Sequence, residues 1–264
     1  MIISSNLKNE KIINFLIISL VAILVLTLFL GYQCKYIKPS FCSFSFIKNF
    51  LAESGFVENL QSLLLFISII ILLFSFNKFK KHKIIKLFLI IKIFALTYYL
   101  GEEISWGQHF FKWSTSELFN KINNQKETNL HNISNLLDQL PRTLVILWCS
   151  LIPIFFYFFK KKYTSSKLIT LIILPHKKLL FLSAIFLFFF LPDFFVDKLN
   201  LHPGHHIDGK DIMESIYFDN FTFNYLERLS EIHELIFCYY FLIYCISFQS
   251  NNNIEKQGSF YTFK

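Results

Sequence analysis

Residues 84–108 read IIKLFLIIKIFALTYYLGEEISWGQ, an apolar run that ends in two adjacent glutamates, a tryptophan and a glutamine. The run is at least as long as the roughly 20 apolar residues that carry an α-helix across a bilayer. Its charged residues before Glu102 are Lys86, near its start, and Lys92. The stretch therefore predicts a membrane-spanning helix over 84–108 with polar groups in its last turns.

The rest of the chain has the same apolar character. Of its 264 residues, 54% are hydrophobic and 17% are charged, whereas soluble domains average about 45–50% apolar and about 25% charged residues. Further runs of bilayer length cover 12–30, 57–76, 140–159, 179–196 and 225–248. Together they predict an all-α fold, a polytopic transmembrane bundle of about six spanning helices. We expect one transmembrane domain over 1–248 and a polar, loosely ordered cytoplasmic tail over 249–264.

Lysines indicate how the bundle is oriented in the membrane. Eleven of them lie in or directly beside two loops, between the second and third runs and between the fourth and fifth: Lys78, Lys80, Lys81, Lys83, Lys86, Lys160, Lys161, Lys162, Lys167, Lys177 and Lys178. Both loops fall on one side, which the positive-inside rule assigns to the cytoplasm, so both termini are expected there. The net charge of +8 is then explained by topology and by anionic lipid headgroups. The lipid bilayer is the expected partner, and no nucleic-acid partner is expected.

Acidic side chains gather at the opposite, outer ends of the second, third and sixth runs: Glu58, Glu102, Glu103, Glu227, Glu231 and Glu234. Spacings of four and three residues place the last three glutamates on one stripe of a helix. Tyr98, Glu102, Ser105 and His109 repeat this spacing on the third run. Because ionisable groups are costly against lipid, we expect these stripes to face one another across a polar cavity that opens outward.

The loop after the third run reads ETNLHNISNLLDQLPR over 127–142. Leu130, Ile133, Leu137 and Leu140 fall on one helical face, and His131, Asn135, Asp138 and Arg142 fall on another. This pattern predicts a short amphipathic helix lying in the membrane interface, with its polar face over the cavity mouth.

The block GEEISWGQ at 101–108 and the downstream ETNLHN at 127–132 resemble the signature of a family of multi-pass bacterial inner-membrane proteins of uncharacterised function. The resemblance covers roughly 55–142 and, more loosely, the stripe of the sixth run. It implies an inner-membrane location and no particular reaction. The matching positions are Glu58, Glu102, Glu103, Trp106, Gln108, Asn129 and His131. His109 departs from the pattern, because the family commonly has Arg there, and this weakens His109 as a metal ligand.

One hypothesis for the function is a metal-dependent enzyme that acts at the outer leaflet on a lipid or lipid-linked substrate. Carboxylates and imidazoles suit a divalent transition metal such as Zn, Mn or Fe, and a bound metal generates hydroxide near neutral pH. The expected metal ligands are Glu102, His109, His131, Glu231 and Glu234. The expected catalytic residues are Glu103, as a general base, and Glu58. The expected cavity lining is Trp106, Gln108, Asn129 and Glu227.

Two other hypotheses fit the same residues. Ionisable groups inside membranes often mark ion paths, which favours a proton- or cation-coupled transporter or a substrate-binding membrane protein. Alternatively, the glutamates only tie helices together, through pairs with groups such as Arg142, Tyr98 and Tyr99. Lys92, inside the third run, is expected to extend its ammonium group toward the inner interface.

Overall fold

The computed structural model describes residues 2–32, 50, 55–79, 83–123, 128–130, 133–163, 172–198 and 229–250. Within these residues every regular element is a helix, which confirms the all-α prediction. The long helices are α1 (Ile2–Tyr32), α3 (Phe56–Lys78), α4 (Lys83–Glu103), α7 (Asn135–Ile146), α8 (Ile152–Tyr163), α10 (Lys178–Lys198) and α12 (Leu229–Ser250). A π-helical turn, η4 (Leu147–Leu151), joins α7 to α8 without a break.

Five stretches of the described residues are long and apolar enough to cross a membrane: Asn9–Leu30, Phe56–Lys78, Lys83–Glu103, Leu140–Phe159 and Glu231–Ser250. α10 adds a shorter apolar segment, Lys178–Leu191. Each of the six predicted runs therefore coincides with a helical stretch, and in five of them the described residues are both long and apolar enough to cross a membrane. The chain is an integral membrane protein.

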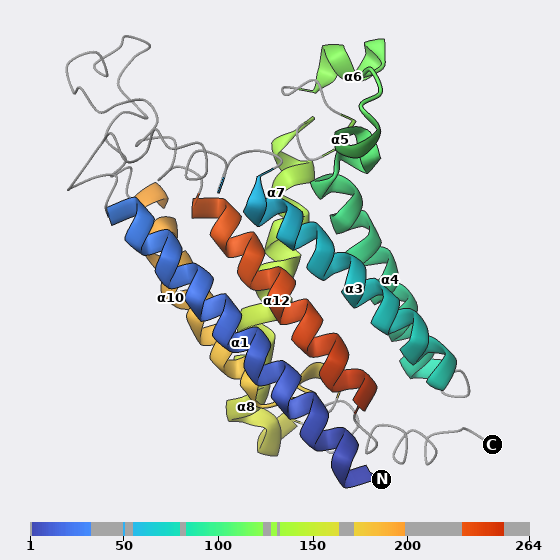
Figure 1. The fold of residues 1–264 in the computed structure, drawn as a ribbon, viewed down its shortest axis with the longest axis vertical. Coiled ribbons are helices and arrows are strands. Elements are labelled where there is room, and N and C mark those ends of the chain that lie inside the picture. Colours follow the sequence, from blue (N-terminus) through green and yellow to red (C-terminus); the bar gives the residue numbers. More distant parts are fainter. Residues whose placement is uncertain are drawn as a thin grey trace.

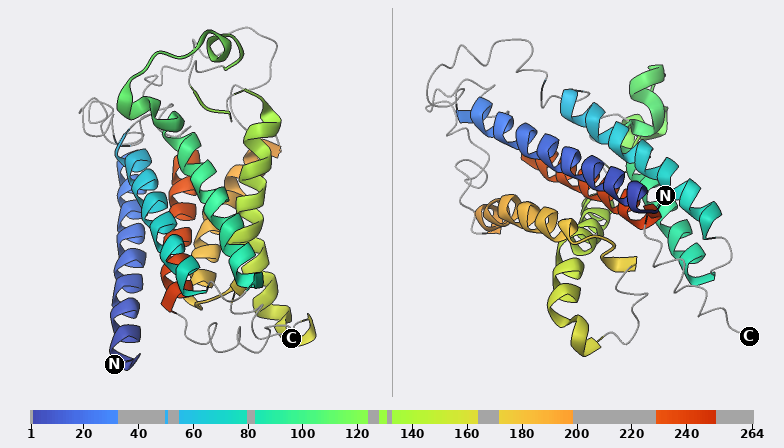
Figure 2. Two further views of the ribbon diagram at one scale, coloured as in Figure 1. Left: turned by 90° about the vertical axis from the view of Figure 1, so that its right-hand side faces the viewer. Right: turned by 60° about the horizontal axis from the view of Figure 1, so that its bottom comes forward.

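The helices lie side by side and alternate in direction along the chain (Figures 1 and 2). At one end, which we call the loop end, α4 finishes, α3 and α12 begin, and two short helices lie beyond them, α5 (Gln108–Phe111) and α6 (Glu117–Ile122). At the other end, α1, α4 and α10 begin and α3 finishes. We call this the basic end, because Lys78, Lys83 and Lys178 lie there.

α12 is the central helix of the bundle. Of its apolar stretch, 78% is buried inside the protein, against 17–39% for the other four candidate spans. It packs against α3, α1 and α10, and all of its residues from Leu235 to Cys245 are buried. A helix that is apolar on all sides is expected to be surrounded by others, and α12 meets this expectation.

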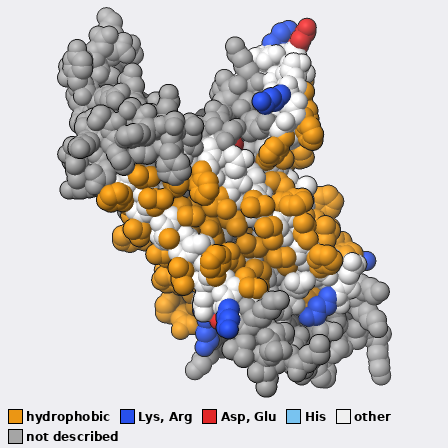
Figure 3. Space-filling model, in the orientation of Figure 1, with side chains coloured by type: hydrophobic (Ala, Val, Ile, Leu, Met, Phe, Trp, Pro, Cys, Tyr) orange, Lys and Arg blue, Asp and Glu red, His pale blue; other side chains and the backbone are white. Residues whose placement is uncertain are grey.

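Large apolar side chains cover the outside of the bundle, including Phe15 on α1, Phe74 on α3 and Phe94 on α4. Figure 3 shows them as a broad hydrophobic surface across the middle of the visible face, with Lys and Arg toward its two ends. Soluble proteins rarely expose a continuous apolar surface of this size. This surface is therefore compatible with contact to a lipid bilayer.

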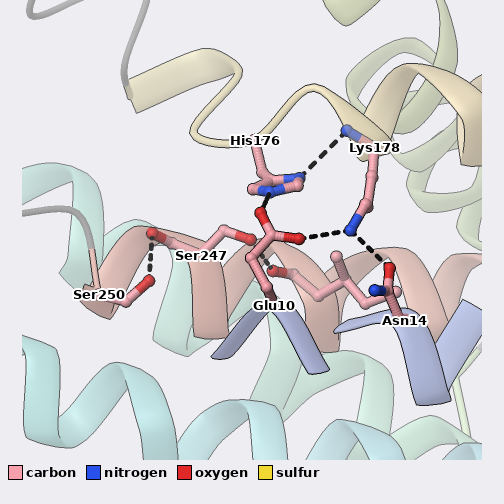
Figure 4. A network of polar contacts seen from close by, with 7 residues as sticks. Glu10, Asn14, His176, Lys178, Ser247 and Ser250 are labelled. Atoms are coloured by element: carbon pink, nitrogen blue, oxygen red, sulfur yellow. Dashed lines mark hydrogen bonds and ion pairs between the residues drawn. The ribbon is translucent and has the colours of Figure 1, made fainter. Parts of the chain in front are cut away.

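A polar network ties α1 to the start of α10 at the basic end (Figure 4). The Glu10 carboxylate accepts hydrogen bonds from Lys178 Nζ at 2.5 Å and from His176 Nε2 at 2.7 Å. Lys178 Nζ also donates to Asn14 Oδ1 at 2.5 Å. The backbone N–H of Lys178 donates to His176 Nδ1 at 3.1 Å, so the proton of the neutral imidazole lies on Nε2, facing Glu10. No pattern in the sequence indicates this network.

Two predicted boundaries were wrong. The third helix ends at Glu103, not at 108, because the backbone turns sharply at Ser105. The stretch predicted to form a separate interfacial helix instead opens the fourth span, since α7 begins at Asn135 and continues through η4 into α8. The Ser134 hydroxyl accepts a hydrogen bond from the backbone N–H of Leu137 and so caps the start of α7. The predicted tail lies outside the described residues, apart from its first two positions, which complete α12.

Candidate functional site

The block GEEISWGQ forms a tight reversal of the chain at the loop end. Ser105 and Trp106 adopt left-handed conformations, with φ of 45° and 54°, and Gly107 follows with φ of 101°. This reversal, η3 (Ser105–Gly107), folds the Trp106 indole back onto Gly101, where an added Cβ atom would lie 2.9 Å from the ring carbons. Trp106 Nε1 then donates to Glu102 Oε1 at 2.7 Å. Only glycine at 101 leaves room for this arrangement.

Glu102 also connects the reversal to a distant loop. Its second carboxylate oxygen, Oε2, accepts a hydrogen bond from the backbone N–H of Leu130 at 2.7 Å. The side chain is buried, with 5% of its surface exposed. Both carboxylate oxygens of Glu102 therefore accept N–H groups, which is the role of a structural anchor.

Two amide side chains complete the connection. Gln108 Oε1 accepts hydrogen bonds from the backbone N–H and the hydroxyl of Thr128, at 2.8 and 2.5 Å. The Asn129 side-chain amide donates to Ser105 Oγ at 3.2 Å, and Asn123 Nδ2 donates to Asn129 Oδ1 at 2.7 Å. The two parts of the sequence signature thus bind each other, and we call this set of contacts the signature clasp. It contains Glu102, Trp106, Gln108 and Asn129, which were predicted as a metal ligand and cavity lining.

A second group of polar side chains, which we call the carboxylate cluster, lies where α3, α4 and α12 meet near the loop end. It consists of Glu58, Glu103, Glu231 and Glu234. Glu103 interacts electrostatically with the other three glutamates and with Arg142 of α7. Arg142 Nη2 forms an ion pair with Glu234 Oε1 at 3.1 Å. The predicted convergence of the second, third and sixth helices is therefore present, and it excludes Glu102.

Gln61, three residues after Glu58 on α3, lies next to the carboxylate cluster. Its Nε2 donates to the backbone carbonyl of Glu231 at 2.7 Å and lies 3.5 Å from Glu231 Oε2. These contacts fix the orientation of the amide. Gln61 Oε1 is then a fully buried acceptor that no donor among the described residues reaches. A site of this kind accommodates a water molecule or another donor beside the carboxylates.

Tyr99 lies one turn before Glu103 on α4, on the side of the cluster that faces the basic end. It interacts electrostatically with Glu103 and Glu234, and its side chain also interacts with the Cys238 thiol. Residues four apart on a helix are neighbours on its surface. The spacing from Tyr99 to Glu103, and from Glu234 to Cys238, is therefore the sequence signal that places these side chains on shared helix faces.

The described residues hold no group of three or more His, Cys, Asp or Glu side chains placed to bind a metal ion. Glu102, one of the predicted ligands, has both oxygens bound in the signature clasp. The side chains of His109 and His131 lie outside the described residues, as does Glu227. The predicted metal centre therefore finds no support in the part of the chain that the structure describes.

No family model, curated protein or solved structure matches this chain. The resemblance carried by GEEISWGQ and ETNLHN stays a prediction.

Proposed function

We propose that the protein is a proton- or cation-coupled membrane transporter that takes up its proton or cation at the carboxylate cluster. The observation that carries this proposal is the environment of Glu103. Its neighbours include three other glutamates and Arg142, and no described residue donates a hydrogen bond to its carboxylate. Like charges close together in a poorly polarisable environment disfavour simultaneous ionisation. The cluster is therefore suited to hold a proton or a cation that can leave again.

This function fits the described residues better than a metal-dependent enzyme does. A metal site needs several ligands converging on one point, whereas Glu102 is held in the clasp and Glu234 is paired with Arg142. Ionisable groups of a helical bundle that face its interior commonly belong to ion and substrate paths. The buried acceptor of Gln61 adds a polar position beside the carboxylates.

We further propose that the basic end faces the cytoplasm and the carboxylate cluster faces the outside of a bacterial inner membrane. The fold supports this orientation because Lys78, Lys83 and Lys178 from three helix ends all lie at the basic end. The positive-inside rule then places that end in the cytoplasm. The cluster would meet solutes or lipid headgroups arriving from the other side.

Labelling with dicyclohexylcarbodiimide tests the proposal, since the reagent attacks protonated carboxyl groups in apolar surroundings. The acid proton moves to a carbodiimide nitrogen while the carboxyl oxygen bonds to the central carbon, and rearrangement leaves a stable N-acylurea. We expect mass spectrometry to find the adduct on Glu103 at neutral pH and to find none in the Glu103→Gln variant. Glu117, which is exposed on α6, is the matched carboxyl that stays unlabelled.

Adding metal ions or monovalent cations before the reagent distinguishes a bound cation from a bound proton. Protection of Glu103 by one cation would identify that cation as the ligand, and labelling that falls only with rising pH would identify the proton. A cluster that shows no adduct at any pH, with infrared spectra showing ionised carboxylates throughout, would contradict the proposal.

A further inference from the structure

Lys92 lies near the middle of α4, nine residues after Lys83 and eleven before Glu103, or roughly 14–17 Å from either end at 1.5 Å per residue. Its side chain is only 7% exposed. The predicted extension toward the inner interface is wrong, because the ammonium group is enclosed by aromatic rings. The distances from Nζ to the ring centroids are 3.6 Å for Trp148, 4.4 Å for Tyr244, 5.4 Å for Phe241 and 5.6 Å for Phe88.

This aromatic cage has two opposing effects on the charge of Lys92. The negative faces of the rings stabilise an ammonium ion, whereas burial at mid-membrane depth favours the neutral amine. Among the described residues, no carboxylate and no hydrogen-bond acceptor contacts Nζ. No such contact therefore favours the ammonium over the neutral amine. The titratable groups that face Lys92 are Cys149 of η4, and Cys245 and Tyr244 of α12. Because none of these is ordinarily anionic at neutral pH, they do not fix the ammonium form.

Rigid packing holds the cage in place. Tyr244 donates its hydroxyl hydrogen bond to the carbonyl of Ile172 at 2.5 Å, and the Trp148 ring meets the Tyr244 ring edge to face, with centroids 6.3 Å apart. Trp148 belongs to the π-helical turn η4, a distortion that often occurs at functional sites. Its indole N–H is buried and has no partner among the described residues. The cage thus places a second N–H donor beside the amine.

We propose that Lys92 is a second proton-binding site, at mid-membrane depth, which gains and loses its proton inside the aromatic cage. The binding site at Lys92 does not rest on the proposed function. In a coupled transporter, such a residue provides an intermediate proton-binding site between the two sides of the membrane.

The indole of Trp148 reports directly on the charge of Lys92. The chain has three tryptophans, so protein labelled with 5-fluorotryptophan gives three ¹⁹F resonances, and Trp148→Phe identifies the one that matters. We expect this resonance to shift with pH along a one-proton curve in the wild type and to lose the shift in Lys92→Met. Lys86→Met removes a lysine of the same helix that is exposed to solvent, and it should leave the curve unchanged. A resonance that stays flat across pH, or that titrates equally in Lys92→Met, would overturn the proposal.

Labelling of Glu103 with a flat Trp148 resonance would refute only the site at Lys92, and the reverse result would refute only the proposed function.

Discussion

The Glu102 carboxylate accepts the backbone N–H of Leu130 at 2.7 Å, which fastens the end of α4 to a loop 28 residues later. The same carboxylate accepts the Trp106 indole N–H, so one buried acid supports both the chain reversal and the loop. Glu102 and its neighbour Glu103 consequently have different roles. Glu102 has a structural role, whereas Glu103 belongs to the carboxylate cluster, where we propose that a proton or cation binds.

Replacing Glu102 with Gln should destabilise the signature clasp. The new amide group would face one of the two N–H donors, and a hydrogen bond to a charged acceptor is worth about 1.5–3 kcal/mol. We expect a loss of this size in the free energy of unfolding in detergent, together with faster hydrogen exchange at the Leu130 amide. Glu117→Gln, on the exposed face of α6, should change neither quantity. An unaltered Leu130 exchange rate would show that the clasp does not hold the loop.

Gly101→Ala should force the Trp106 ring away from α4. The added methyl group would lie 2.9 Å from three ring carbons, and overpacking of this kind costs about 1–3 kcal/mol. The double variant Gly101→Ala/Trp106→Leu should recover part of this loss, because leucine removes the obstructing ring. Additive losses in a double-mutant cycle of unfolding free energies would contradict the steric explanation.

Arg142→Gln should raise the yield of carbodiimide adduct on Glu234. The ion pair at 3.1 Å favours the ionised form of that carboxyl, and its removal favours protonation. The cost in stability should be modest, about 1 kcal/mol or less, because the Arg142 side chain is 40% exposed. Arg142→Lys keeps the charge and serves as the control with low labelling. Equal labelling of Glu234 in all three proteins would indicate that Arg142 does not control its proton.

Glu10→Gln should loosen the contact between α1 and the start of α10. The Glu10 carboxylate binds both Lys178 and His176, yet its side chain is 47% exposed, so we expect a loss of no more than about 1 kcal/mol. The difference from wild type, measured by thermal unfolding, should shrink as salt is added, because salt screens partly exposed charges. Lys177→Gln, which removes an exposed neighbouring lysine, is the control. A difference that does not depend on salt would assign the effect to packing.

Much of the bundle could be predicted from the length and hydropathy of the apolar runs. A helix spans a membrane because it is long and apolar, and both properties are read directly from runs such as 84–108 and 140–159. The convergence of the second, third and sixth runs at one end could also be predicted, since their acidic residues gather there and ionisable groups avoid lipid. The helical spacing, however, placed Glu102 on the shared stripe, whereas Glu103 is the residue that meets the other glutamates. The alternation of the helices between the loop end and the basic end follows from the same runs.

The sequence by itself determined where the chain enters the membrane and which faces carry charge, because these depend on local hydropathy and helical periodicity. Only the tertiary structure decided which glutamates act as anchors. Ser105 and Trp106 adopt left-handed conformations that their residue types do not favour, and contacts with Gly101 and the distant loop stabilise them. The cage around Lys92 likewise required three elements to meet. Contacts between residues far apart in the chain decide such features, and no local pattern encodes them.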